Sequence, residues 1–221
     1  MQPFFSVIVT EHNAEKYMRK GLDSIINQTF TDYELIIICD ACNDNTVAIA
    51  REYSNKVFEV DWANCGKTYN KGLEEVTGKW ILFMDDDDWW ATSDAFQIIA
   101  NTLQNDEEYD MLAFGFIFGN NGYHATQSPK QLYYAPWSKA WRASFVGNTR
   151  FAEVPHSADV SFANATHSHA KIRFINDALY YYNYMRPGSI SQMLSTGKLA
   201  RLEEMGYKEG AVIWQNLERN Q

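Results

Sequence analysis

The stretch Trp80-Ile-Leu-Phe-Met-Asp-Asp-Asp-Asp-Trp-Trp90 constrains the fold of this chain more than any other. Its first five residues, 80–84, are mostly apolar and predict a strand buried on both faces, as in a parallel sheet. Four carboxylates, Asp85 to Asp88, follow at the expected end of that strand. Carboxylates this close disfavour one another's ionisation. The run is therefore either fully solvated or shares its site with a positive charge.

A solvated loop is the ordinary interpretation of an acidic run, but the fusion to a buried strand and the two following tryptophans argue against it here. Ligands of open α/β sheets bind at the carboxyl ends of the strands. Carboxylate oxygens suit a hard cation such as Mg²⁺ or Mn²⁺, and phosphate oxygens can complete its shell. The stretch therefore predicts a metal–phosphate site.

The rest of the first half alternates between strands and helices. Apolar strands are expected at residues 4–9, 33–38, 57–60 and 80–84, and helices at 14–28, from a cap at Asn43 or Asp44 to about 54, and at 66–76. This alternation predicts right-handed parallel crossovers, and hence a doubly wound, mostly parallel α/β sheet of the Rossmann-like kind.

Beyond Asp88 the pattern changes. It predicts a helix at 93–103, a strand at 110–118 with a hairpin turn at 119–122, a helical segment at 137–145, strands at 172–175 and 179–185, and a helical tail at 198–217. Residues 150–170 show no clear periodicity. We expect one domain over residues 1–221, with a nucleotide-binding half at about 1–90 and an acceptor-binding half, including the tail, at about 91–221.

Charge and cysteine content narrow the function. The formal net charge of −9 and the pI of about 5.0 argue against a broad surface for nucleic acid. The N-terminus lacks the pattern of a signal peptide and no apolar run is long enough to span a membrane, so we expect a cytoplasmic protein, with peripheral association at the inner face of a membrane as the alternative.

Cys39 and Cys42 have C-x-x-C spacing. Because no second pair exists to complete a zinc site, we interpret them as two reduced thiols at a strand end.

Several stretches together resemble the family 2 glycosyltransferases of the GT-A fold. They are Ser6–Tyr17, Leu22–Thr29, Asp40–Thr46, Asn64–Lys67 with Asn70 and Gly72, Asp85–Asp87, Trp137–Lys139, Phe151 with Asp159–Phe162, and Tyr182 with Arg186–Ser191. The resemblance covers nearly the whole chain. It implies an inverting enzyme that moves a sugar from a nucleotide-diphosphate sugar, most simply a UDP-sugar, to a hydroxyl acceptor.

The same resemblance implies roles for individual residues. Asp85 and Asp87 would hold Mn²⁺ or Mg²⁺ in a D-x-D motif, and Asp159 would be the general base. The residues expected to bind the nucleotide sugar are Thr10, Glu11, His12, Asn13, Asp40, Lys67, Asp85, Asp86 and Arg186. Among them, Asp40 could accept the imide N–H of uracil, and Lys67 and Arg186 could face phosphate oxygens.

Each of these roles has a plainer alternative. Asp40 could cap a helix, His12 could be a surface turn residue, Lys67 and Arg186 could be solvated, and the tryptophans could be core instead of stacking on a sugar. His156, His167 and His169 surround Asp159 in the sequence. One of them could be a metal ligand, but we favour the interpretation that they are surface residues.

Three departures from the family pattern are visible: Cys39 and Ala41 after the second strand, a shortened segment between Gly66 and Asn70, and Ala158 before Asp159. They leave open a non-catalytic sugar-nucleotide or glycan-binding module on a degenerate transferase fold. The other alternative is a nucleotidyltransferase, which also joins an α/β sheet to an acid-bound metal, but Thr10–Asn13 is not the glycine- and arginine-rich phosphate loop typical of that class.

Overall fold

Strands and helices alternate through the first half of the chain, as the apolar pattern predicts. The computed structural model describes residues 2–104, 108–119 and 121–198. Its strands are β1 (Phe5–Glu11), β2 (Tyr33–Asp40), β3 (Lys56–Val60), β4 (Trp80–Asp85), β5 (Trp89–Trp90), β6 (Met111–Phe118), β7 (Tyr123–Ala125), β8 (Lys139–Arg142) and β9 (Ile172–Tyr182). Its helices are α1 (Met18–Ile26), α2 (Thr46–Tyr53), α3 (Cys65–Glu74), α4 (Ala95–Leu103), η1 (a 3₁₀ turn, Pro136–Ser138), α5 (Ala143–Val146), α6 (Ala158–Thr166) and α7 (Ile190–Ser195).

The strand order shows where a ligand can bind. The sheet runs β3-β2-β1-β4-β8-β6-β9-β5, with β7 paired to β6. Strand β1 pairs in parallel with β2 and β4, and β2 pairs in parallel with β3. The chain therefore moves outward from β1 to β3 and returns on the other side of β1 as β4. The carboxyl ends of β1 and β4 flank this switch in direction, which is where open α/β sheets bind ligands.

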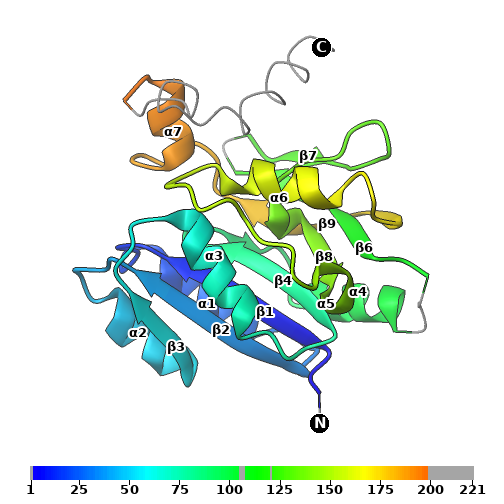
Figure 1. The fold of residues 1–221 in the computed structure, drawn as a ribbon, viewed down its shortest axis with the longest axis horizontal. Coiled ribbons are helices and arrows are strands. Elements are labelled where there is room, and N and C mark those ends of the chain that lie inside the picture. The colour runs from blue at the N-terminus through cyan, green and yellow to red at the C-terminus, as the bar shows by residue number, and fades with distance from the viewer. Residues whose placement is uncertain (1, 105–107, 120, 199–221) are drawn as a thin grey trace.

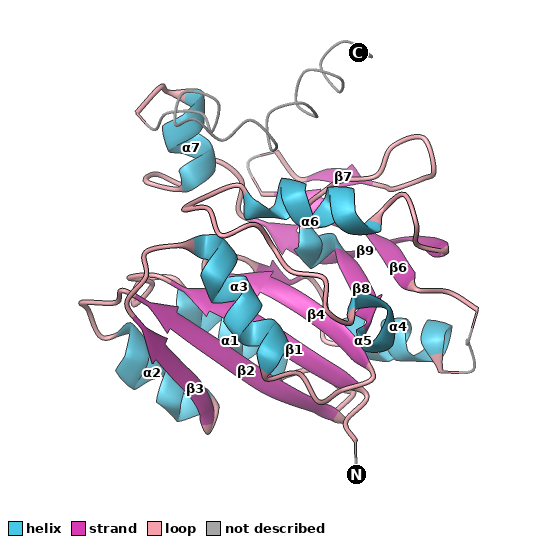
Figure 2. Cartoon of the chain, in the orientation of Figure 1, coloured by secondary structure: helices cyan, strands magenta, loops and turns pink. Residues whose placement is uncertain are grey.

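Helices cover both faces of the sheet (Figure 1). Helices α1 and α2, which connect the outward strands, lie behind the sheet in Figure 2, whereas α3, which makes the return, lies in front together with α6. A Cβ atom at Gly72 would lie 2.5 Å from Ile8 Cγ2, so glycine allows α3 to pack closely on β1. The doubly wound, mostly parallel arrangement is confirmed.

Strand β8 corrects the prediction of a helix at 137–145. Residues Lys139–Arg142 pair antiparallel with both β4 and β6, and only Ala143–Val146 are α-helical. Ala140 and Trp141 are fully buried between those neighbours. Four residues are too few to show a strand period, and pairing on both sides decides the conformation here.

Two further segments differ from the sequence-based expectation. Residues 172–175 and 179–185 were expected as two strands, but Ile172–Tyr182 is one strand that pairs in parallel with β6. The register shifts between Ala113↔Phe174 and Gly115↔Ala178, so the polar Asn176 and Asp177 lie in a bulge instead of a turn. Within the unassigned 150–170, Ala158–Thr166 forms α6. The expected tail at 198–217 lies outside the described residues, apart from Lys198.

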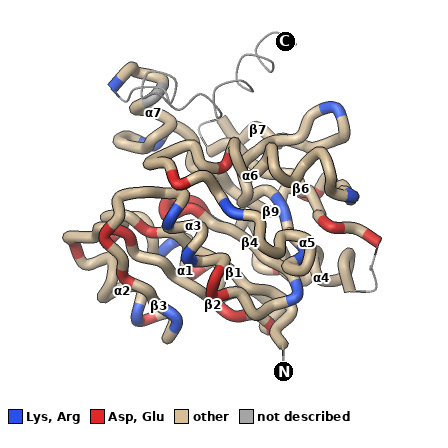
Figure 3. Tube along the Cα trace, in the orientation of Figure 1, with Lys and Arg blue, Asp and Glu red and all other residues tan. Residues whose placement is uncertain are grey.

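Two surface properties bear on localisation and partners. No helix within the described ranges is long and apolar enough to cross a membrane. Lysine and arginine are scattered over both halves in Figure 3 and form no continuous band in that view.

Candidate active site

The four consecutive aspartates have different environments. Asp85 ends β4, is half-buried and accepts a hydrogen bond of 2.6 Å from the Tyr69 hydroxyl. Asp88 is only 1% exposed, and its carboxylate accepts hydrogen bonds of 2.8 Å from the Tyr180 hydroxyl and from the Asn183 backbone N–H. Asp88 therefore anchors the acidic run to β9 and the residues after it.

The positive charge beside the run is Arg186. Its Nε donates to Asp87 Oδ2, and its Nη2 lies 3.8 Å from Asp86 Oδ1. The guanidinium also lies 4.3 Å from the centre of the Tyr17 ring. Its side chain is only 16% exposed. The sequence argument that a cation must share this site is therefore met, in part, by a residue about a hundred positions further along the chain.

Arg186 does not neutralise the run completely. Burial raises the pKa of Asp85 to about 7, and the charges of Asp87 and Asp159 also raise it, against the Tyr69 hydrogen bond. Burial and then the charge of Asp87 raise the pKa of Asp86 to about 8, although Arg186 opposes this. The site thus holds more negative charge than one guanidinium compensates.

The donor set fits a hard divalent cation that also binds a phosphate. No group of three or more His, Cys, Asp or Glu side chains that could hold a metal occurs among the described residues. The protein therefore offers the carboxylates of Asp85 and Asp87, and the remaining ligands would be diphosphate oxygens and water. Magnesium is commonly bound in this way, through one or two carboxylates and substrate phosphates.

The end of β1 lies next to the acidic run. Thr10 pairs in register with Asp85 across β1 and β4. The exposed His12 has Nδ1 2.7 Å from the Asp40 carbonyl oxygen, so this nitrogen carries the proton, and Asn13 Nδ2 lies 3.2 Å from its Nε2. Glu11 is only 2% exposed, and neither of its carboxyl oxygens has a hydrogen-bond partner within the described part of the chain.

Asp40 is placed differently from a base-reading residue. Its Oδ1 accepts the backbone N–H groups of Trp62 and Ala63 at 2.7 and 2.9 Å. Its Oδ2 accepts the backbone N–H of Asn64 at 2.9 Å and the Thr68 hydroxyl at 2.7 Å. Burial alone would raise the pKa of Asp40, but these hydrogen bonds outweigh it and lower the pKa. The carboxylate holds the loop from β3 to α3, which is a structural role but not the expected helix cap, because the cap of α3 is Asn64.

Replacing Asp40 by alanine is therefore expected to lower stability more than nucleobase preference. Three backbone N–H groups would lose their acceptor, whereas the Thr68 hydroxyl could still donate to the Asn64 carbonyl oxygen at 2.8 Å, and each buried group left unpaired costs about 1–3 kcal/mol. We expect a clear fall in the thermal midpoint and an unchanged ratio of UDP to GDP affinity. Asp44→Ala, which removes a carboxylate that accepts from Thr46 at the start of α2, is the control and should cost about 1 kcal/mol. A selective loss of UDP affinity in Asp40→Ala would restore the uracil role.

The start of α3 is already covered by protein. The backbone N–H groups of Cys65 and Gly66 donate to the carbonyl oxygens of Pro155 and Val154, and that of Lys67 donates to Asn64 Oδ1 at 3.0 Å. A Cβ atom at Gly66 would lie 1.8 Å from the Ala152 carbonyl oxygen, so the approach requires glycine. These backbone N–H groups are not available to a diphosphate. At this helix start the Lys67 side chain is available, and its Nζ lies 3.8 Å from Glu153 Oε2.

Asp159 lies half-buried in the first turn of α6. Its charge raises the pKa of Asp85, and the charge of Lys139 lowers the pKa of Asp159 itself. Burial raises the pKa of Asp159 to about 6, although the backbone N–H groups of Val160 and Asp159 and the charge of Lys139 oppose the shift. Lys139 is fully buried, and its ammonium donates to Tyr133 and Ala135 carbonyl oxygens and to Ser138 Oγ. A carboxyl group with a pKa near neutrality is suited to accept a proton.

The aromatic residues near the run are largely committed to packing. Trp90 and Trp137 are 3% and 5% exposed, and Trp137 stacks on Tyr180 with ring centres 4.8 Å apart. Trp89 has Lys20 Nζ 3.1 Å from its ring centre and stacks on Tyr181 at 4.0 Å. These contacts support the core interpretation over sugar stacking.

Of the three histidines near Asp159, which were expected to be surface residues, only one lies on the surface. His156 is 3% exposed, and within the described part of the chain its Nε2 has no hydrogen-bond partner. His167 is half-buried and stacks on Trp141 with ring centres 5.8 Å apart, and its Nε2 is also buried without a partner there. Only His169 is exposed, beside Ser168.

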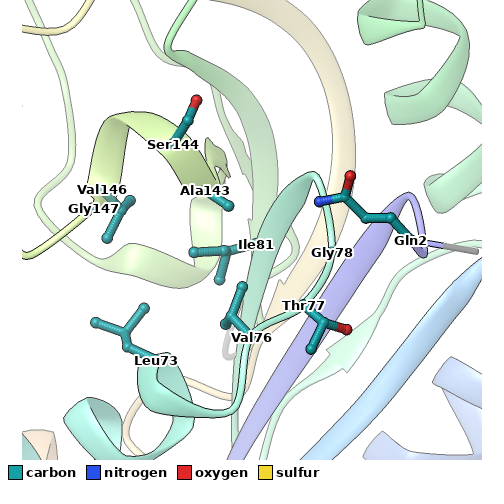
Figure 4. Close-up of a pocket in the computed structure, with 10 residues that line it drawn as sticks. All are labelled: Gln2, Leu73, Val76, Thr77, Gly78, Ile81, Ala143, Ser144, Val146 and Gly147. Atoms are coloured by element: carbon teal, nitrogen blue, oxygen red, sulfur yellow. The ribbon is translucent and has the colours of Figure 1, made fainter.

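A cavity of about 360 Å³ lies at the other end of β4 (Figure 4). It is lined by residues that include Thr77 and Gly78 before β4 and Ala143 and Gly147 after β8. It therefore opens at the amino end of β4, away from the acidic run.

Sequence reasoning missed Tyr69, Tyr180 and Tyr17. The first two fix Asp85 and Asp88, and the third supports Arg186. Tyr180 and Tyr17 lie next to or at the end of stretches already noted. The residue type alone does not tell whether such a tyrosine is only part of the core, and the three-dimensional contacts are needed to identify the partner of its hydroxyl group or ring.

Comparison with known proteins agrees with this geometry. Residues 6–165 match Glycosyl transferase family 2. EpsH of Bacillus subtilis is 27% identical over 209 residues, which cover 81% of this chain and 60% of EpsH. The crystal structure of residues 1–349 of Staphylococcus aureus TarS in complex with UDP-GlcNAc superposes with a TM-score of 0.74 at 25% identity, covering 85% of this chain and 60% of that one.

A Pyrobaculum calidifontis mannosyltransferase, PcManGT, in complex with GDP-Man and Mn²⁺, has a TM-score of 0.63 at 14% identity, covering 91% of this chain and 66% of that one, and shares the fold. The fold is thus the GT-A fold of such enzymes. The chain spans about 60% of the length of EpsH and of the crystallised TarS chain. Because the family match covers most of its length, this chain belongs to glycosyl transferase family 2.

Proposed function

We propose that this chain is an inverting, metal-dependent glycosyltransferase that takes a sugar from a UDP-sugar and joins it to a hydroxyl acceptor. The observation that carries the proposal is the pairing of an under-neutralised acidic run, Asp85 to Asp87, with a half-buried carboxyl group of raised pKa, Asp159, at one edge of the sheet. The UDP-GlcNAc bound to the related TarS supports the choice of a UDP-sugar.

In this proposal each residue has a definite task. Asp159 accepts the proton of the acceptor hydroxyl as that oxygen attacks the anomeric carbon from the face opposite the diphosphate. Asp85 and Asp87 hold Mn²⁺ or Mg²⁺, which when bound stabilises the charge that develops on the leaving diphosphate. Arg186, which donates to Asp87 in this structure, would lie close enough to the diphosphate to contact a phosphate oxygen. Thr10, His12, Asn13 and Asp86 line the nucleoside side, and Lys67 approaches the phosphates.

Two of the departures from the family pattern, Cys39 with Ala41 and the shortened segment between Gly66 and Asn70, bear on recognition of the nucleobase, whereas Ala158 before Asp159 bears on the identity of the general base. Position 39 is a buried cysteine, which has no carboxyl group, and the Asp40 carboxylate accepts hydrogen bonds from the protein, so neither position presents a free carboxylate to uracil. We propose that the backbone around His12 and Asn13, together with the His12 ring, recognises the base.

Slow hydrolysis of the donor tests the proposal before an acceptor is known. The protein is incubated with UDP- and GDP-sugars, with Mn²⁺ or with EDTA, and released nucleotide is measured. We expect release from at least one UDP-sugar, dependent on the metal. Nucleotide binding without release would favour the non-catalytic module, and release of pyrophosphate from a nucleoside triphosphate and sugar phosphate would favour a nucleotidyltransferase.

A further inference from the structure

The C-x-x-C pair lies at the edge of the proposed donor site. Cys39 is the next-to-last residue of β2, is 1% exposed and pairs in register with Glu11. Ala41 has a φ angle of 50°, in the left-handed region that non-glycine residues seldom adopt. The turn brings the half-buried Cys42 back over Cys39, and their thiols are hydrogen-bonded to each other. Both thiols are free in this structure.

The Cys42 sulfur also holds the turn that follows β1. It lies 3.5 Å from the Glu11 carbonyl oxygen and 3.7 Å from that of Asp40, and it accepts the backbone N–H of Asn13. The same turn is fixed by the Asn43 N–H, which donates to Asn13 Oδ1 at 2.8 Å. A change in the position of Cys42 would therefore change the conformation of the turn that contains His12 and Asn13.

The two thiols differ in reactivity. The hydrogen bond from Cys39 lowers the pKa of Cys42 to about 7, with further help from the Asn13 N–H and from His12, against burial and the charge of Asp44. The same hydrogen bond, then burial, raises the pKa of Cys39, and the Cys42, Glu11 and Glu59 charges add to this. A more exposed thiolate backed by a buried thiol is the arrangement of an attacking and a resolving cysteine.

We propose that Cys39 and Cys42 form a reversible disulfide that reshapes the turn at His12 and Asn13 and so weakens donor binding. The effect on the donor rests on the proposed function, whereas the disulfide does not. A disulfide joins sulfur atoms about 2.05 Å apart and removes the S–H group of Cys42, which can then no longer donate to the carbonyl oxygens of Glu11 and Asp40. In reducing compartments such bonds are transient and are usually catalytic or redox-sensing.

The oxidant is a small-molecule disulfide such as oxidised glutathione. The Cys42 thiolate attacks one of its sulfur atoms, the glutathione disulfide bond breaks, and one glutathione thiolate leaves. Cys39 then attacks the Cys42 sulfur of the mixed disulfide and expels the second glutathione, and its proton passes to the departing thiolate. Two protein thiols lose two electrons and two protons, and one small disulfide becomes two thiols.

The chain of residues 1–221 is incubated with oxidised glutathione and compared with the reduced chain by intact mass, by peptide mapping after thiol blocking, and by UDP titration with Mn²⁺. We expect the loss of two hydrogens, a 39–42 link, and UDP affinity lowered by about tenfold, as for one misplaced hydrogen bond. Dithiothreitol should restore it. Hydrogen exchange of the peptide containing residues 10–13 should rise on oxidation.

Matched variants separate the outcomes. Cys42→Ser should not respond to oxidised glutathione, and Cys65→Ser should respond as the parent does. Cys39→Ser should stop at a glutathione adduct on Cys42 and form no intramolecular link, which identifies Cys39 as the resolving cysteine. A stable glutathione adduct on Cys42 of the parent without closure, or a 39–42 link in the parent that leaves both UDP affinity and the exchange of residues 10–13 unchanged, would overturn the proposal. If the reduced chain binds no UDP, the proposed function fails, and mass and hydrogen exchange still decide whether the pair is a switch.

Discussion

Replacing Asp159 by asparagine is expected to reduce sugar transfer by about 10²–10⁴-fold, the usual contribution of a general base, while UDP affinity stays within a few-fold. Asparagine keeps the shape of the side chain but cannot accept the proton of the acceptor hydroxyl. Donor binding should hardly change, because the nucleotide contacts proposed here come from the ends of β1 and β4 and from Arg186.

The pH profile gives this prediction a second measurement. Because burial raises the pKa of Asp159 to about 6, the carboxylate is the major form only above that pH. A base must be ionised to act, so the rate of transfer by the parent should fall as pH decreases through about 6. UDP affinity should be measured at each pH, because Asp85 and Asp86 titrate in a neighbouring range.

Glu153 is the matched control, because it is the nearest other acid in that segment. Its side chain is 63% exposed, and Oε2 lies 3.8 Å from Lys67 Nζ. Glu153→Gln should transfer sugar at close to the parental rate. Normal transfer by Asp159→Asn together with loss in Glu153→Gln would show that the base is Glu153. An acceptor screen must come first, since a parent that transfers to nothing would favour the binding-module alternative.

The first half of the fold was predictable because its central strands are buried on both faces. Such strands appear as continuous apolar runs, and parallel pairing then brings their carboxyl ends to one edge, so that Thr10 and Asp85 could be expected together. The second half was less predictable. Strand β8 has only four residues. Ser157 before α6 is a common N-cap residue type, but its φ of 58° lies in the left-handed region and its side chain makes no capping hydrogen bond.

Side-chain partners across the sheet were beyond sequence reasoning. The acidic run predicted a neighbouring positive charge, but no local pattern connects Asp87 with Arg186, or Asp88 with Tyr180, since each pair is more than 90 residues apart. Asp40 illustrates the reverse case. Its residue type and place at a strand end fit both a ligand contact and a structural role, and only the four protein donors around its carboxylate distinguish them.

Replacing Asp87 by alanine is expected to remove most UDP binding in the presence of Mn²⁺ or Mg²⁺. Even residues that only orient a metal ligand cost about 10–100-fold in metal affinity when mutated, so loss of a ligand should reach at least about a hundredfold. The donor diphosphate would then face Asp85 and Asp86 without a cation between them. Calorimetric titration of UDP, with Mn²⁺ and with excess EDTA, measures the effect.

The pair Asp87→Asn and Asp86→Asn separates coordination from electrostatics. Each replaces one carboxyl group of the same acidic run by an amide of the same shape, but only Asp87 is proposed to hold the metal, and only Asp87 accepts a hydrogen bond from Arg186 Nε. We expect Asp87→Asn to resemble Asp87→Ala, and Asp86→Asn to retain metal-dependent UDP binding. In EDTA all three chains should bind UDP equally weakly. Equally tight binding by the parent with and without EDTA would contradict metal dependence. Equal losses in both asparagine variants would mean that the acidic run acts through its total charge, and Asp87 would then have no special role as a ligand.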